Sequence, residues 1–121
     1  MPALVELLGL LFEQEADFGP DPAAQARGLR MILADPAVGR VLVARSGERV
    51  IGMVNTLETV STALGERVAV LEDLVVRPER RGGGVGTALL RAALEHARAA
   101  GCQRVTLLTD RDNAAARRIY E

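Results

Sequence analysis

Lysine and tryptophan are absent from this sequence of 121 residues, and cysteine, histidine and aromatic residues are rare. The single cysteine, Cys102, excludes an intramolecular disulfide and a metal site built from several cysteines. The single histidine, His96, excludes the usual histidine-rich metal sites and argues against a Ser-His-Asp triad, so we expect no metal in the site. Aromatic residues make up 2% of the chain, which argues against an aromatic cage and against a surface for stacking nucleic-acid bases.

The charge of the chain is nearly balanced, because 15 basic residues, all arginine, face 16 acidic ones for a formal net charge of -1. A nucleic-acid-binding domain normally carries a strong basic excess, so we expect no nucleic acid as a partner. The apolar opening ALVELLGLLF follows no positive charge, is interrupted by Glu6, and is shorter than the roughly 20 residues that span a bilayer. Its leucines recur at helical spacing, which predicts a core helix. The chain is therefore expected to be cytoplasmic, with no membrane partner.

Apolar periodicity and turn residues predict eight elements in the order ααβββαβα. After the first helix these are a helix over 21–33, strands over 40–45, 50–60 and 67–76, a helix over 84–100, a strand over 104–109 and a last helix over 112–120. Asp21 is expected to cap the second helix, and Asp110 or Asp112 the last one. The strand–helix–strand unit implies a parallel pair within a mixed sheet, hence an α/β (α+β) fold.

Four glycines stand between positions 82 and 86, directly before the helix predicted over 84–100. Such a loop presents free N–H groups at the positive end of a helix and predicts a phosphate site; a tight turn that only packs helix against strand is the alternative. A P-loop needs a lysine, and the chain has none. A dinucleotide-binding loop has the pattern G-x-G-x-x-G/A. Read from Gly82, its last position is Thr87, and read from Gly84 it is Leu89, so neither register fits the pattern.

The loop at residues 81–86, Arg-Gly-Gly-Gly-Val-Gly, matches the pattern Q/R-x-x-G-x-G/A, and here the chain resembles the GNAT superfamily of acyl-CoA-dependent N-acyltransferases. The resemblance runs from the strand LEDLVV to the end of the chain, and the preceding helices and hairpin extend it over nearly the whole sequence. It implies the GNAT fold in one domain over 1–121, with acetyl-CoA as co-substrate. The family's first strand and last two strands are lacking, so we expect a domain incomplete at both ends, or a homodimer partner that covers the bare sheet edge.

The resemblance assigns most cofactor contacts to the backbone. The strand end Leu74, Val75 and Val76 is implied to bind the pantetheine arm, and an N–H of Leu74 or Val75 to polarise the thioester carbonyl. Asn113 resembles the family's asparagine that hydrogen-bonds the same arm; a helix cap is the alternative. The residues implied to hold the pyrophosphate are Arg81, Gly82, Gly83, Gly84, Val85, Gly86 and Thr87. The neighbouring Arg77 and Arg80 add positive potential.

Catalytic roles also follow from the resemblance. Tyr120 stands seven residues after Asn113, as in the family pattern N-x-x-A-x-x-x-Y, and is implied to protonate the departing thiolate as general acid. An alkyl amine is mostly protonated at neutral pH, so a base is needed, and the carboxylates of Glu72 and Asp73 are the candidates. Pleat alternation points them to opposite faces unless a bulge intervenes. We favour Glu72.

The acceptor is less constrained than the donor. LEDLVV is similar to the corresponding strand of diamine acetyltransferases, which favours a small primary amine or a polyamine. The resemblance places acceptor selectivity in FEQEADFGPD, whose carboxylates would attract a cation. Two other functions stay open: a non-catalytic acyl-CoA-binding or regulatory module, and a protein N-terminal acetyltransferase.

Overall fold

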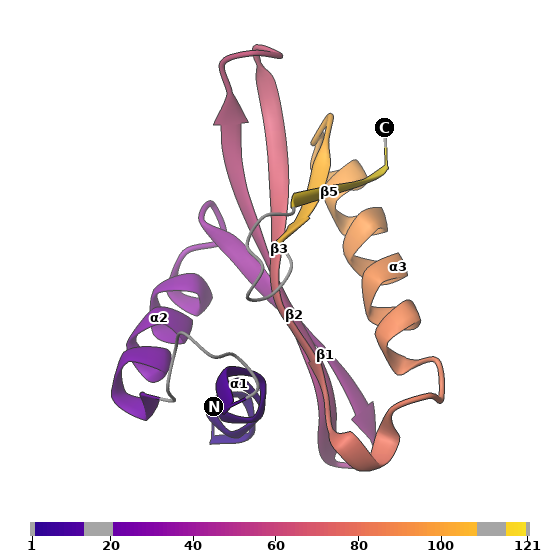
Figure 1. Ribbon diagram of the computed structural model, residues 1–121. Coiled ribbons are helices and arrows are strands. Elements are labelled where there is room, and N and C mark those ends of the chain that lie inside the picture. The colour runs from indigo at the N-terminus through magenta and orange to yellow at the C-terminus, as the bar shows by residue number, and fades with distance from the viewer. Residues whose placement is uncertain (1, 14–20, 109–115, 121) are drawn as a thin grey trace.

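The computed structural model describes residues 2–13, 21–108 and 116–120 of the chain. The described residues form three helices and five strands besides a short 3-10 helix (Figure 1). The elements are α1 (Pro2–Glu13), α2 (Pro22–Ala34), β1 (Gly39–Ser46), β2 (Arg49–Ser61), β3 (Glu66–Val76), the 3-10 helix Pro78–Arg80, α3 (Val85–Ala99), β4 (Val105–Leu108) and β5 (Ala116–Tyr120).

The five described strands form one mixed sheet in the order β1-β2-β3-β4-β5. Every neighbouring pair is antiparallel except β3 and β4, which run parallel and are joined by α3. The mixed sheet and its parallel pair confirm the predicted fold class. The hairpin of β1 and β2 and the strand β3 also lie within a few residues of their predicted positions.

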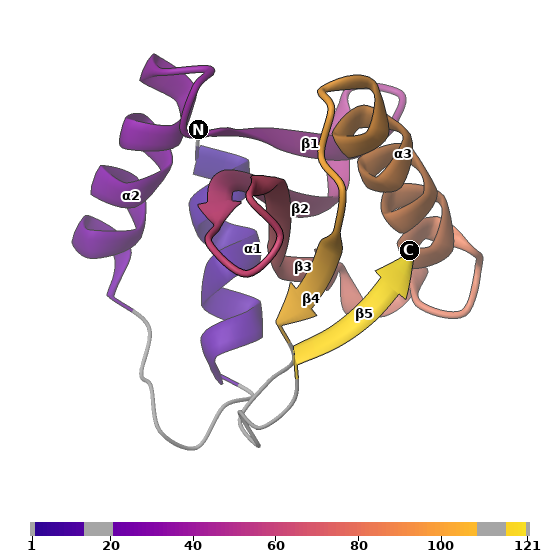
Figure 2. The same ribbon diagram turned by 90° about the horizontal axis from the view of Figure 1, so that it is seen from above.

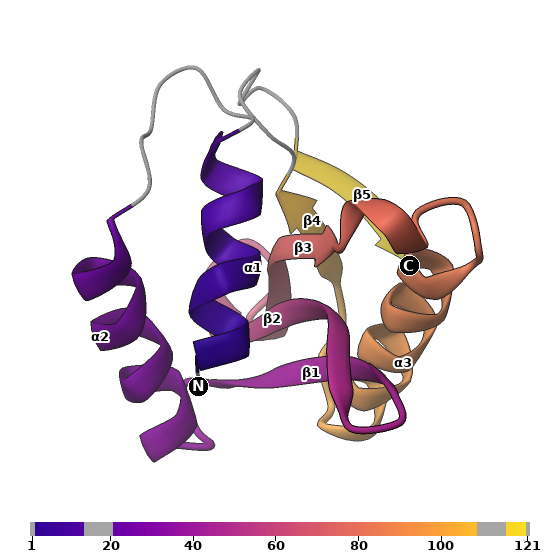
Figure 3. The same cartoon turned by 90° about the horizontal axis from the view of Figure 1, so that it is seen from below.

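Helices cover both faces of the sheet, so the domain has three layers. Figures 2 and 3 show α1 and α2 together on one face and α3 on the other. The core on the α1/α2 face includes Leu7, Leu29 and Met53, and the core on the α3 face includes Val54 and Leu89. Met53 and Val54 are neighbours on β2 and pack in the cores on opposite faces of the sheet, because side chains alternate along a strand.

Caps at the helix ends agree with the sequence pattern. The carboxylate of Asp21 accepts a hydrogen bond from Ala24 N at 3.1 Å, the arrangement expected of an N-cap. Gly101 has a φ of 88° directly after α3, a left-handed conformation that glycine adopts at no steric cost. Both predicted helix boundaries are confirmed to within one residue.

The helix predicted over 112–120 is wrong, because residues 116–120 form the strand β5. β5 pairs antiparallel with β4, with Leu108 opposite Ala116 and Val105 opposite Tyr120. A helix of two turns is marginal by itself in water, whereas a strand here satisfies the backbone groups along an edge of β4 that would otherwise be bare. Tertiary pairing therefore overrides the local helical pattern.

Candidate active site

The two parallel strands pair over only part of their length. Ala69–Leu71 of β3 lie opposite Val105–Leu107 of β4, and β3 then continues to its end at Val76. Beyond that short ladder, Leu74–Val76 have β2 on one side and no strand on the other side within the described residues. Backbone groups on this edge can bind a ligand that lies along β3 as an extra strand.

The glycine loop reaches α3 through two residues in the left-handed region. Gly82 and Gly84 have φ of 84° and 87°, and only glycine adopts these angles without steric cost. The first hydrogen bond of α3 runs from Ala88 N to Gly84 O at 3.0 Å. Within the described part of the chain, the N–H groups of residues 82–87 donate to no acceptor. These unpaired donors at the start of a helix of 15 residues are suited to an anion such as a phosphate group.

A cleft of about 550 Å³ opens between the glycine loop and the free edge of β3. It brings together nearly all of the predicted cofactor residues, although they come from two separate segments. Gly83 does not line it. Leu11 of α1 does, although the sequence pattern placed it only on an apolar stripe of a core helix. The lining consists of Leu11, Leu74, Val75, Val76, Arg80, Arg81, Gly82, Gly84, Val85, Gly86 and Thr87.

A β-bulge interrupts β3 just before this edge. Asn55 of β2 lies opposite Glu72, and Met53 lies opposite Val75, so two residues of β3 face the single residue between them on β2. Asp73, within the bulge, has a φ of 59°, a region in which aspartate and asparagine are enriched among non-glycine residues. Alternation predicted opposite faces for Glu72 and Asp73 unless a bulge intervenes, and β3 does contain a bulge at this point.

The bulge places both carboxylates on the α1/α2 face. Glu72 shares that face with Asn55, because residues directly opposite one another in a ladder point the same way. Asp73 is on the same side, since its Oδ2 accepts a hydrogen bond of 2.8 Å from Asn55 Nδ2. Alternation would place the two residues on opposite faces in a regular strand, and the bulge is the exception that the sequence analysis allowed.

The environment of Asp73 raises its pKa above that of an ordinary aspartate. Burial and the neighbouring charge of Glu72 raise the pKa of Asp73 from 3.8 to about 6, although the hydrogen bond from Asn55 acts in the opposite direction. A carboxylate with this pKa is mostly ionised at neutral pH and is still a stronger base than an ordinary one. Asp73, the less favoured candidate from the sequence, is by this pKa a stronger base than an ordinary carboxylate, although neither Asp73 nor Glu72 lines the cleft.

Comparisons with known proteins agree with this geometry. The model of the Acetyltransferase (GNAT) family matches residues 2–121. The chain belongs to the GNAT acetyltransferase family. This GNAT chain is 36% identical over 81 residues to the uncharacterized N-acetyltransferase YhfO of Bacillus subtilis (strain 168), an alignment covering 67% of the chain and 54% of YhfO. The chain thus spans about half the length of that relative.

Solved structures of similar fold include two that cover most of the GNAT chain. One is the integron cassette protein HFX_CASS3 from the mobile metagenome of Cole Harbour Salt Marsh, with a TM-score of 0.82 and 26% identity over 89% of this chain and 70% of that one. The other is a putative acetyltransferase from Agrobacterium tumefaciens str. C58, with a TM-score of 0.73 and 30% identity over 91% and 75% of the two chains.

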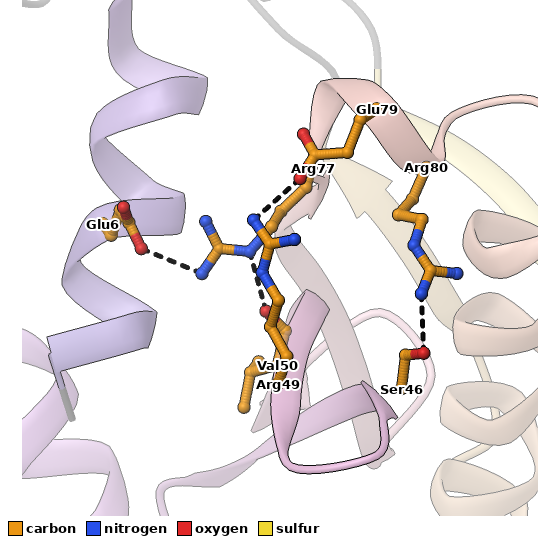
Figure 4. Close-up of polar contacts among 7 residues, drawn as sticks. All are labelled: Glu6, Ser46, Arg49, Val50, Arg77, Glu79 and Arg80. Atoms are coloured by element: carbon orange, nitrogen blue, oxygen red, sulfur yellow. Dashed lines mark hydrogen bonds and ion pairs between the residues drawn. The ribbon is translucent and has the colours of Figure 1, made fainter.

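The three arginines around the glycine loop of the GNAT chain have different surroundings. Arg81 lines the cleft and donates from Nε to Val76 O at 3.1 Å. Arg80 also lines the cleft but is bound to Ser46 Oγ at 2.6 Å (Figure 4). Arg77 is buried and points away from the loop towards Val50 and Glu6, as Figure 4 shows. Arg77 does not line the cleft, so its positive charge would reach a phosphate there only from a distance.

Glu72 and Gly83, two predicted residues of the GNAT site, do not line the cleft. Asn113 lies outside the described residues. Tyr120 lies on β5 opposite Val105, and Val105 in turn lies opposite Ala69, five residues or roughly 16 Å along β3 from Leu74. In Figure 1, β5 is near the end of the sheet where α3 ends, whereas the glycine loop is where α3 begins.

The thiol of Cys102 lies in the core of the GNAT chain and not in the cleft. Burial raises the pKa of Cys102, which packs with Ala97 and Val105 in the α3 core as an inert thiol does. Within the described ranges, no group of three or more histidine, cysteine, aspartate or glutamate side chains is placed to hold a metal ion. None of the described helices has the length and apolar character needed to cross a membrane.

Proposed function

We propose that this chain transfers an acetyl group from acetyl-CoA to a primary amine, which attacks the thioester directly. One observation carries the proposal: unpaired N–H groups of the glycine loop and the unpaired edge of β3 line the same cleft. The first suits a pyrophosphate and the second an extended arm. Together they match the two chemically different parts of CoA, its pyrophosphate and its pantetheine arm.

The residues that would hold CoA are those predicted from the sequence. The backbone of residues 81–87 would bind the pyrophosphate, with added charge from Arg81, and the edge Leu74–Val76 would bind the pantetheine arm. CoA supplies the activated acetyl group as a thioester. An N–H of Leu74 or Val75 would stabilise the negative charge that develops on the carbonyl oxygen. Asn113 remains a proposed contact to the pantetheine arm.

We assign proton removal from the amine to the carboxylates of the β3 bulge. Glu72 is the candidate favoured by the sequence, and Asp73 is the one favoured by its raised pKa and its hydrogen bond from Asn55. The amine proton would pass to this carboxylate as the N–C bond forms. The sulfur that leaves needs a proton in return, and the Tyr120 hydroxyl is the proposed donor. That role requires residues 116–120 to leave the pairing with β4 and approach the cleft.

The strand LEDLVV leads us to propose a small amine or a polyamine as acceptor. The position of Tyr120 on β5 favours a second candidate function, a non-catalytic CoA-binding module, because it leaves the described cleft without a thiol-protonating group. A cytoplasmic location and a homodimer stay predictions.

Thiol release from acetyl-CoA, measured across small amines, polyamines and peptides, tests the proposal together with calorimetric titration of CoA. We expect CoA to bind and thiol to be released with at least one small amine. Binding without release for any acceptor would instead support the non-catalytic module. Release restricted to peptides would support N-terminal acetylation of proteins. A failure of CoA to bind would overturn all three.

A further inference from the structure

Leu11 contributes to the cleft from an element that the other lining residues do not share. The rest of the lining comes from the end of β3 and from the segment 80–87, whereas Leu11 lies on α1. Leu11 packs against the core on the α1/α2 face of the sheet, and Val85 packs against the core on the α3 face. A ligand that lies along the free edge of β3 would therefore have an apolar side chain from each helical layer beside it.

The course of α1 explains how Leu11 reaches the cleft. Figures 2 and 3 show α1 running across the strands, from the β1 side of the sheet towards the β4 side. Its last turn, to which Leu11 belongs, therefore lies towards the free edge of β3. Glu6, about 7.5 Å earlier along the helix axis, accepts a hydrogen bond of 2.8 Å from Arg77 Nη2, next to the end of β3. This contact holds α1, and with it Leu11, against the strand.

Leu11 lies at the level of β3 where the thioester is proposed to bind. Val75 is 4% exposed and belongs to the core against which Leu11 packs. The N–H of Leu74 or Val75 is also the proposed partner of the thioester carbonyl, to which the acyl group is attached. Among the residues that line the cleft, Leu11 is therefore the one that faces the acyl group from the α1/α2 layer.

We propose that Leu11 limits the size of the acyl group and so selects acetyl-CoA over CoA thioesters of longer acyl chains. An acetyl group ends at its methyl, whereas each further methylene of a propionyl or butyryl group would meet the Leu11 side chain. Because that side chain is packed against a core, displacing it is unfavourable. Pockets that exclude one methylene discriminate by roughly 10- to 200-fold.

This inference rests on the proposed function, because it names the acyl group that the proposed CoA site accepts. It concerns binding of the thioester and needs no acceptor, so the two proposals can fail separately. Selective binding of acetyl-CoA without thiol release for any amine would overturn the enzymatic activity and keep the role of Leu11. Thiol release with equal binding of short and long thioesters would do the reverse.

The test is calorimetric titration of the whole chain with CoA, acetyl-CoA, propionyl-CoA and butyryl-CoA. We expect wild-type protein to bind butyryl-CoA about tenfold more weakly than acetyl-CoA. Leu11→Ala removes most of the side chain, so butyryl-CoA should then bind within about threefold of acetyl-CoA. The affinity for CoA, which carries no acyl group, should stay unchanged within error. An equal change for CoA and for every thioester would overturn the proposal, because Leu11 would then contact only the arm that all four share.

Leu10→Ala is the matched control. Leu10 is next to Leu11 on α1 and packs against the same core, but it does not line the cleft. The substitution removes the same atoms, and the ratio of the affinities for acetyl-CoA and butyryl-CoA should keep its wild-type value. A change in that ratio as large as that of Leu11→Ala would overturn the proposal, since it would reflect a general loosening of α1.

Leu11→Phe covers the case in which Leu11→Ala fails to fold. The larger side chain can extend into the cleft, and acetyl-CoA should then bind about tenfold more weakly while the affinity for CoA is kept. The proposal is overturned if this variant weakens CoA and acetyl-CoA equally. It is also overturned if wild-type protein binds butyryl-CoA as tightly as acetyl-CoA.

Discussion

The guanidinium of Arg77 joins α1 to the end of β3 through Glu6, which lies 71 residues earlier in the chain. Nη2 donates to Glu6 Oε1 at 2.8 Å, and Nε donates to Val50 O at 2.8 Å. Arg77 is 7% exposed, whereas the Glu6 side chain is 63% exposed. Because Leu11 of α1 lines the cleft, this contact also holds one wall of the cleft against the strand that forms another.

Substitution of Arg77 tests how much that contact stabilises the fold. Arg77→Met should lower the free energy of unfolding by about 2 kcal/mol, because it removes the part-buried hydrogen bond to the Val50 carbonyl and ends the ion pair with Glu6. Glu6→Gln should cost about 0.5 kcal/mol, as expected for an exposed partner. Urea unfolding measures both.

The control for Arg77 is Arg49→Gln. Arg49 and Glu79 form an ion pair of 2.7 Å in which both side chains are about half exposed. Its loss should leave the urea midpoint unchanged within error. A loss as large as that of Arg77→Met would show that burial does not distinguish the two contacts.

Two alanine substitutions in the glycine loop test whether stability is lost through backbone strain at one position or through the replacement of any glycine. Gly84→Ala should destabilise the fold by about 1–2 kcal/mol, because an L residue is strained at its φ of 87°. Gly83 is the matched control: its φ is not positive, and an added Cβ would meet nothing closer than Arg80 O at 3.7 Å. Gly83→Ala should therefore be nearly neutral in thermal unfolding. Equal losses for the two variants would contradict this account of the loop.

The raised pKa of Asp73 predicts the direction of a pH effect on stability. Between 3.8 and about 6, the folded protein binds more protons at this carboxyl than the unfolded chain does. Stability from this residue therefore falls as the pH rises through that window, and ionised Asp73 costs on the order of 3 kcal/mol at neutral pH.

Asp73→Asn should accordingly raise the free energy of unfolding at pH 7 and have little effect at pH 4. Urea unfolding at a series of pH values measures the difference between wild type and variant. Glu48→Gln, in the exposed turn between β1 and β2, is the control and should give a constant offset. An offset for Asp73→Asn that does not grow between pH 4 and pH 7 would contradict the raised pKa.

Tyr120→Phe tests the proposed general acid. If Tyr120 protonates the leaving thiolate, the variant should lose at least tenfold in kcat with little change in KM for acetyl-CoA. If residues 116–120 stay paired with β4, turnover should be unchanged at every pH. Arg118→Gln, on the same strand, checks that effects of altering β5 are not mistaken for loss of the acid.

Local patterns in the sequence predicted most elements, because each depends on nearby residues. Asp21 and Gly101 identified helix ends, and alternation identified the strands of the hairpin. The helix predicted over 112–120 is wrong at residues 116–120, because its helical pattern is weak and the open edge of β4 could not be known in advance. Leu11 packs against the α1/α2 core as its place on the leucine stripe predicts, but such a stripe does not reveal that the same residue also lines a cleft.

The sequence by itself determined the glycine loop before α3 and, through its resemblance to the GNAT family, the donor that we propose the loop holds. That information is local, since glycines next to a helix start present N–H groups whatever surrounds them. Only the tertiary structure decided how Glu72 and Asp73 are placed. Their common face depends on a bulge against β2, and the raised pKa of Asp73 depends first on burial and then on the charge of Glu72. The bulge and the burial of Asp73 both depend on residues far apart in the chain. They cannot be predicted from the alternation of side chains within one strand.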